Sequence, residues 1–329
     1  MAKTDNCISA AKAYSCLGGS YVVIEFIVIL LGKVVVTKLF GCEELTDNGR
    51  ILYEFVLDFL LILPLNYVVL RKLPRFKIDQ KRLGIKNFFT CACIAFSLGT
   101  LADIFTIALM HIANMVTGIQ TSNPLVDSLS SMSLFGHILI GCIIAPIYEE
   151  LQFRKILLDR VAHYGEVTAM LLSGIMFGLA HGNIYQFFYT ALSGCFYAFV
   201  YLRTGKIKYT IFLHMLNNSF STIIWGISLL LNGGYITVAY ACTMAFGVLA
   251  IVIIIFGIVL MVRNKDKFIF EHHKGEVDVG YRFTTSIVNV GMIVYLFYWT
   301  GQTVLTLFGT SFTQLLISAI GCGLQGLFK

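Results

Sequence analysis

Long stretches without a charged residue alternate with short polar segments along this chain. Each of the three longest is long enough for two helical passes, since one pass through a bilayer needs about 20 apolar residues. These stretches cover residues 167–202, 209–262 and 283–328. Turn-forming residues interrupt them at His181-Gly182-Asn183, Asn232-Gly233-Gly234 and Gly309-Thr310-Ser311. Earlier spans are predicted at about 18–41, 51–70, 87–112 and 130–148.

This pattern predicts an all-α fold: a polytopic transmembrane helix bundle of about 8–10 spans, forming a single integral membrane domain over residues 1–329. Composition agrees, because 57% of the residues are hydrophobic and only 13% are charged. The mean hydropathy is +0.81. Soluble domains carry about 25% charged residues, so a soluble enzyme is excluded.

The net charge of +6 is concentrated in alternate loops. Basic segments lie at 71–86, 154–160, 203–208 and 263–274, whereas the loops 42–50, 113–129 and 232–235 carry a single cation, Arg50. Positive charge marks the cytoplasmic side of membrane proteins. We therefore expect a multi-pass protein of the cell membrane, in contact with the lipid bilayer and not with nucleic acid, with the N-terminus and Lys329 in the cytoplasm.

Three polar groups lie in the most apolar part of the chain, where ionisable side chains are costly and usually mark a site. They are Glu149-Glu150 with Arg154, His181 one turn after Phe177, and His214 with Asn218. On a helix Glu150 and Arg154 share a face and can pair, while Glu149 points about 100° away and is free to face a cavity. Each group also has a structural interpretation: solvated acids at a helix end, a hydrogen-bonded core histidine, and a polar contact between helices.

The ordered set EExxxR, FxxxH and HxxxN resembles the CPBP family of intramembrane proteases, the CAAX-protease, bacteriocin-processing or Abi family. The resemblance covers the motif-bearing core, residues 130–220, and all seven motif positions match. It implies an active site in an intramembrane cavity and an endopeptidase that cleaves a membrane-associated peptide or a lipidated protein. In that family Glu149 would activate water with help from His181, and His214 and Asn218 would stabilise the oxyanion. Glu150, Arg154 and Phe177 would support them.

The cofactor is left open by the residues. Glu149, His181 and His214 could hold a divalent metal such as zinc, with a position free for water. However, the chain has no HExxH helix, and Asn is an uncommon zinc ligand. A glutamate mechanism without metal uses the same residues and is the alternative.

Two other classes of function compete with the protease. An ion- or proton-coupled transporter would explain the acids in or near the early spans, Glu25, Glu54, Asp58 and Asp103, although no internal repeat supports it. These acids can equally lie at the membrane interface or form hydrogen bonds between helices. A non-catalytic immunity or scaffold member of the family is the third possibility.

Overall fold

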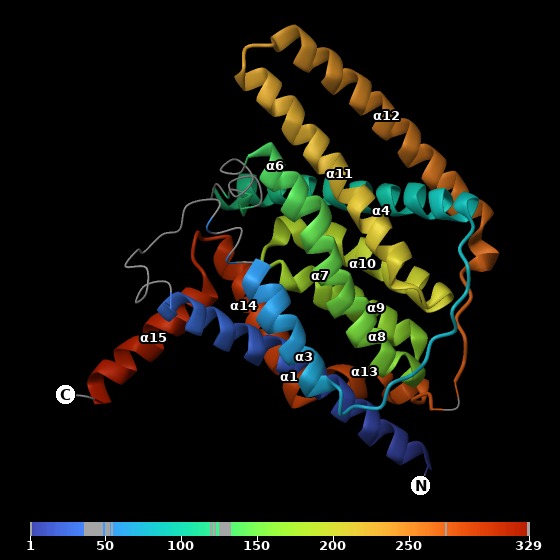
Figure 1. Ribbon diagram of the computed structural model, residues 1–329, viewed down its shortest axis with the longest axis vertical. Helices are drawn as coiled ribbons and strands as arrows, with labels where there is room; N and C mark the ends of the chain where they lie inside the picture. Colours follow the sequence, from blue (N-terminus) through green and yellow to red (C-terminus); the bar gives the residue numbers. More distant parts are fainter. Residues whose placement is uncertain are drawn as a thin grey trace.

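The computed structural model describes residues 2–35, 49, 53, 55–118, 121, 123–124, 133–273 and 275–327. Every regular element in these residues is a helix (Figure 1), which confirms the all-α prediction. The N-terminal half contains α1 (Ala2–Val35), α3 (Leu63–Leu70) after a π-helical turn at Val56–Ile62, α4 (Ile85–Thr117), α6 (Leu134–Gly136), α7 (Ala145–Glu150) and α8 (Leu157–Val161). The C-terminal half contains α9 (Glu166–Ala180), α10 (Ile184–Thr204), α11 (Ile207–Asn232), α12 (Ile236–Arg263), α13 (Val279–Ile287), α14 (Val290–Thr306) and α15 (Phe312–Leu327).

One continuous helix, Leu134–Tyr164, carries the first motif and is called the site helix here. It joins α6, α7 and α8 through two π-helical turns, at His137–Ile144 and Leu151–Ile156. A π-helical turn holds one more residue than an α-helical turn and is frequent at functional sites. The two turns flank the short α-helical segment that ends in Glu149 and Glu150.

By length and composition, four described helices can cross a membrane: Thr4–Val35, Ile85–Thr117, Leu134–Tyr164 and Ile236–Arg263. Helices α13 and α14 add a fifth if their 64° bend lies within one span. The number is below the predicted 8–10 because α10 and α11, with 21 and 26 residues, are long enough but not apolar enough, and because other pieces of the apolar runs are short. For example, α9 has 15 residues and α15 has 16, less than the about 20 of a full crossing.

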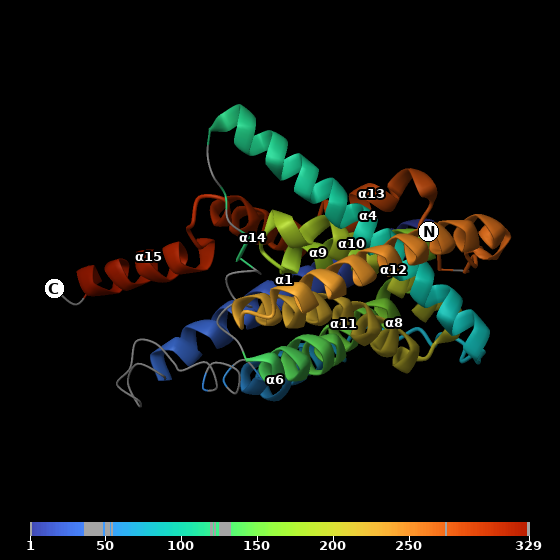
Figure 2. The ribbon, with the colours of Figure 1, turned by 90° about the horizontal axis from the view of Figure 1, so that it is seen from above.

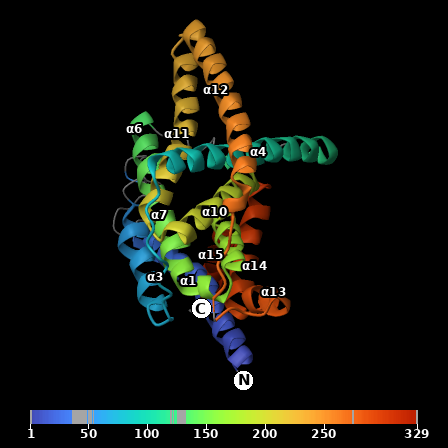
Figure 3. The same cartoon turned by 90° about the vertical axis from the view of Figure 1, so that its right-hand side faces the viewer.

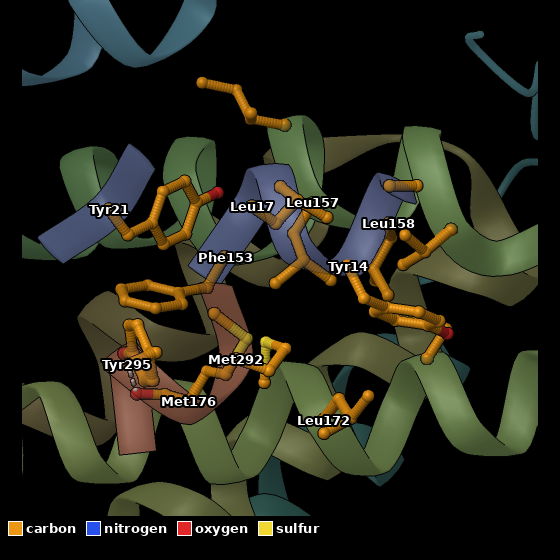
Figure 4. Close-up of a cluster of buried hydrophobic side chains, with 14 of the residues drawn as sticks. Tyr14, Leu17, Tyr21, Phe153, Leu157, Leu158, Leu172, Met176, Met292 and Tyr295 are labelled. Atoms are coloured by element: carbon orange, nitrogen blue, oxygen red, sulfur yellow. Dashed lines mark hydrogen bonds between the residues drawn. The ribbon is translucent and has the colours of Figure 1, made fainter. Parts of the chain in front are cut away.

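The hydrophobic core joins α1, the site helix, α9 and α14, as Figure 4 shows. Tyr21 of α1 stacks edge-on against Phe153, and its hydroxyl donates to the Gln152 carbonyl at 2.7 Å. Tyr295 of α14 donates in the same way to the Met176 carbonyl of α9, also at 2.7 Å. Because a buried hydroxyl needs a partner, these two bonds fix how α1 and α14 sit on the helices of the site.

Helices α9 and α10 pack unusually closely. A Cβ atom on Gly178 would lie 2.8 Å from the Phe187 carbonyl oxygen, so only glycine allows this approach. The turn between them contains Gly182 with φ of +63°, a conformation that favours glycine. Asn183 then caps α10 by accepting from the backbone N–H of Gln186 at 2.9 Å. The Gly174-x-x-x-Gly178 spacing and the predicted turn thus fix the angle between α10 and α9, the helix that carries the FxxxH motif.

The predicted basic loops meet at one end of the molecule. The extended segment 74–84 crosses the ends of α8 and α10, where Arg75 pairs with Asp159 at 2.9 Å and the Lys81 amide donates to the Thr204 carbonyl at 2.9 Å. The segment after α12 joins them through Glu271, which pairs with Lys81 at 3.3 Å. The loops therefore share one side, as the charge pattern requires.

Helix α4 runs across α11 and α12, and the α11–α12 hairpin extends beyond the other helices (Figures 1 and 3). Only 6% of the most apolar stretch of α12 is buried, as expected for a helix surrounded by lipid. Seen from above, α15 also reaches away from the remaining helices (Figure 2).

Candidate active site

The fold brings all three predicted motifs together, on the site helix, on α9 and on α11. Glu150 connects two of them. Its Oε1 atom lies 3.3 Å from Arg154 Nη1, one helical turn along, and 3.1 Å from His214 Nδ1 of α11. The side chains of Glu150 and Arg154 are both 0% exposed. A carboxylate in such a place is stable only with cationic or donating partners, and here it has both.

Phe177 is the packing centre of the site. The Arg154 guanidinium lies over its ring, 4.4 Å from the centroid, and is also 5.6 Å from the centroid of Tyr197. The rings of His181 and His214 are nearly perpendicular to the same Phe177 ring, and their centroids lie 4.9 and 5.7 Å from its centroid. Aromatic faces attract cations and aromatic edges, so Phe177 holds residues from all three motifs in place. Tyr197, which the sequence motifs do not include, completes the packing around Arg154.

Glu149 differs from its neighbour in environment. Its side chain is 20% exposed, and its Oε2 atom lies 3.6 Å from His214 Nε2, beyond hydrogen-bond distance. His214 therefore stands between the two carboxylates. Since a carboxylate only accepts, the Nδ1–H group of His214 donates to Glu150, and the Nε2 atom of His214 faces Glu149. The structure has the predicted pair of Glu150 with Arg154, and the separate role of Glu149 stays a prediction.

His181 ends α9, and its Nδ1 atom lies 2.9 Å from the Phe177 carbonyl oxygen. A carbonyl oxygen only accepts, so Nδ1 is the donor and Nε2 keeps its lone pair. The next residues hold this turn, because the Asn183 amide donates to the His181 carbonyl at 2.9 Å. The ring is thus fixed in orientation by its own backbone.

A cavity of about 120 Å³ lies beside Glu149 and His181. This volume corresponds to about four water molecules. Its wall consists of Glu25, Asp58, Tyr148, Glu149, Gln152, Phe153, Phe177, Ala180 and His181. A water molecule held there can contact a carboxylate and an imidazole together, which is the arrangement that general-base catalysis requires.

Two cavity residues, Glu25 and Asp58, belong to none of the motifs. They stand on α1 and on the turn Val56–Ile62, far from the motif segment in sequence. In the sequence, Glu25 and Asp58 were noticeable as acids in apolar spans. The sequence did not reveal that their helices would pack against the site helix. Of the other two early acids, Asp103 does not line this cavity, and Glu54 lies outside the described residues.

Two predicted oxyanion donors do not line the cavity. His214 lies between Glu149 and Glu150, as described above, and the side-chain amide of Asn218 donates to the Gly141 carbonyl of the site helix at 2.8 Å. These contacts make α11 a support for the site helix. The role of His214 and Asn218 in stabilising the oxyanion therefore stays a prediction.

The predicted metal ligands do not converge. Within the described residues, the one group of His, Cys, Asp and Glu whose ligand atoms all lie within 4.8 Å is Glu166, Glu271 and His273. That group lies at the basic end and not at the motifs, and Arg203 pairs with both of its carboxylates. Glu149, His181 and His214 do not form such a group, although His214 Nε2 lies 3.6 Å from Glu149 Oε2.

Comparison with known proteins finds one family and one protein to which this chain is similar. The family described as "Type II CAAX prenyl endopeptidase Rce1-like" matches residues 131–220, the segment that contains all three motifs. The protein named "Putative membrane peptidase YdiL" of Bacillus subtilis (strain 168) is 25% identical over 224 residues, which cover 64% of this chain and 88% of that protein. No solved structure matches.

Proposed function

We propose that this chain is a CAAX-type membrane protease of the CPBP family, which it resembles over residues 131–220. In this proposal it hydrolyses a peptide bond of a membrane-associated peptide or protein with Glu149 as the general base. The observation that carries the proposal is the cavity shared by Glu149 and His181. Lipidated proteins are within the proposed substrate class. The enzyme acts in the cell membrane, with its basic end in the cytoplasm.

The proposed reaction starts with a water molecule in the cavity. It donates one hydrogen bond to the Glu149 carboxylate and the other to Nε2 of His181, which has a free lone pair because Nδ1 donates to Phe177. Glu149 takes the proton as the water oxygen attacks the carbonyl carbon. When the C–N bond breaks, Glu149 returns this proton to the leaving amine.

The remaining motif residues position Glu149. His214 is bound to Glu150 at 3.1 Å and presents Nε2 to Glu149 at 3.6 Å, a gap that substrate can close, since catalytic contacts are often long in the free enzyme. Arg154 compensates the charge of Glu150. No step passes through a metal, because the ligand atoms that a zinc site needs do not converge on Glu149.

Cleavage of quenched peptides tests the proposal. The purified full chain in liposomes is assayed on hydrophobic peptides, some with prenylated CAAX ends, beside Glu149→Gln. Asp103→Asn is the matched control, since it makes the same acid-to-amide change in a membrane helix away from the cavity. We expect Glu149→Gln to lose turnover by about 10²–10⁴-fold and the control to retain it. Equal turnover in wild type and Glu149→Gln would overturn the assignment.

A further inference from the structure

A second and larger hollow of the molecule plays no part in the proposed chemistry. It is an open groove of about 870 Å³ between the first turns of α4 and of α11, at the basic end. The groove and the catalytic cavity share no lining residue. Apart from Ser219 and Gly84, its described lining residues are two cations and apolar or aromatic side chains, with no aspartate or glutamate among them. This composition indicates a ligand that is apolar along most of its length and negatively charged at one end.

The apolar walls of the groove are faces of two helices. On α4, Ile85, Phe88 and Phe89 line the groove, and residues three or four apart share one face of a helix. On α11, Phe212 and Leu216 line it in the same way, one turn apart. Ile85 is 73% exposed, and Phe89 and Phe212 are each 56% exposed. The walls are therefore open to hydrocarbon from the surrounding membrane.

The two cations lie together at one end of the groove. Arg82 comes shortly before α4, and Lys208 lies in the first turn of α11. A hydrogen bond joins the two segments, because the Leu83 amide donates to the Tyr209 hydroxyl at 3.2 Å. The Lys208 ammonium lies 5.4 Å from the centroid of the Tyr209 ring. The positive charge therefore lies where the two helices begin, and the apolar walls continue along both helices from there.

These two cations differ from their neighbours at the basic end. Arg75, Lys81 and Arg203 each pair with a carboxylate of the protein. Within the described part of the chain, neither Arg82 nor Lys208 forms such an ion pair, and both side chains are exposed. The charge at the end of the groove is thus available to an anion that the protein itself does not supply.

The shape of the groove indicates which kind of anion. From Lys208 to Ser219 its α11 wall is about 16 Å long, which is about half of a hydrocarbon core of about 30 Å and comparable to the depth of one leaflet. A small soluble anion would leave this wall uncovered. A zwitterionic lipid would bring a cation of its own beside Arg82 and Lys208. Basic pockets between membrane helices on the cytoplasmic side bind anionic lipid headgroups.

We propose that the groove between α4 and α11 binds an anionic phospholipid of the cytoplasmic leaflet. Its phosphate lies between Arg82 and Lys208, and an acyl chain lies against Phe89 and Phe212. The site does not depend on peptide hydrolysis, since none of its residues lines the catalytic cavity. Because α11 also carries His214, the bound lipid rests on a helix that supports the candidate active site.

The test compares two lipids that differ only in headgroup. Phosphatidylglycerol and phosphatidylcholine with the same acyl chains are titrated onto the full chain in detergent, and native mass spectrometry measures the bound lipid. We expect one saturable site that prefers phosphatidylglycerol. The preference should fall about tenfold or more in Arg82→Gln/Lys208→Gln, whose two exposed side chains can change without disturbing the core. The control Arg263→Gln/Lys265→Gln removes the same charge from exposed positions outside the groove and should keep the preference.

No preference in the wild type, or an equal loss in the two double variants, would overturn the site. Two competitors then identify other occupants. Glycerol 3-phosphate carries the anion without acyl chains, and farnesol carries an apolar chain without charge. We expect that neither displaces phosphatidylglycerol at an equal concentration. Displacement by glycerol 3-phosphate would assign the groove to a soluble anion, and displacement by farnesol would assign it to an uncharged chain. Either result would refute the phospholipid.

Discussion

His214 Nδ1 lies 3.1 Å from Glu150 Oε1, although the two residues are 64 positions apart in the chain. This contact ties the third motif to the first and turns the imidazole so that Nε2 faces Glu149. The acid that the protein buries completely thus orients the histidine that faces the more exposed acid. The two carboxylates of the Glu-Glu pair therefore lie in different environments, one fully buried and one partly exposed.

The two motif histidines are expected to behave differently when removed. His181→Ala and His214→Ala should each lower turnover by about 10²-fold or more. His214→Ala should in addition destabilise the protein by about 1–3 kcal/mol, because it deprives the buried Glu150 of a donor. Among the described residues, the His181 side chain hydrogen-bonds to the Phe177 carbonyl of its own helix, so its loss should cost little stability. Turnover and reversible unfolding in micelles separate the two effects; equal stability of both variants would contradict this assignment.

Glu150 and Arg154 should show strong energetic coupling. Both side chains are fully buried, so Glu150→Gln or Arg154→Met alone leaves an uncompensated charge and should cost about 3–5 kcal/mol. The double variant removes both charges and should cost clearly less than the sum of the single changes. A double-mutant cycle measures this coupling from the unfolding free energies of the wild type, the two single variants and the double variant. Additive costs would show that the pair is not coupled.

Gly194 is a sensitive position because α10 presses against the site there. A Cβ atom on it would lie 2.8 Å from both Arg154 Nη2 and Phe177 Cδ1. We expect Gly194→Ala to destabilise the protein by about 1–3 kcal/mol and to reduce turnover by displacing the arginine from the ring. Gly226→Ala on α11 is the control, since nothing lies within 4 Å of its added methyl group, and it should lose no stability. Equal effects in the two variants would argue against this packing.

Removal of metal ions should leave turnover unchanged. The described residues around Glu149 do not gather three ligand atoms within 4.8 Å. A strong chelator, followed by dialysis, should therefore preserve cleavage under conditions that inactivate a zinc peptidase control. Loss of cleavage that zinc restores would instead establish Glu149, His181 and His214 as ligands that converge only in the active complex.

Local patterns in the sequence predicted the helices and their turns well. The breaks at 181–183, 232–234 and 309–311 all separate helices in the structure, because glycine and asparagine act within a few residues of the chain. The motif spacing also identified the three elements that meet at the site. The number of spans was less predictable, since an apolar run does not reveal whether its pieces cross the bilayer or lie within the protein.

The residues that would form the cavity could not be predicted from the sequence. Glu25 and Asp58 join Glu149 only because α1 and the turn Val56–Ile62 pack against the site helix. In the sequence these acids supported only the competing transporter hypothesis or a structural role, and their position beside Glu149 and His181 emerges from the fold. Tyr197 was missed for a similar reason, because its contact with Arg154 depends on the packing of α10.

Because of the π-helical turn at Leu151–Ile156, the geometry of the site depends on the number of residues in the site helix. Deleting one residue there would let the turn relax to an ordinary α-helix without loss of hydrogen bonds. Everything beyond it, including the core residues Leu157 and Leu158, would keep its register, while Glu149 and Glu150 stay where they are. Arg154, inside the turn, would change its position relative to both. A single-codon deletion would therefore keep the Glu-Glu pair and the register of the core but change how Arg154 meets Glu150.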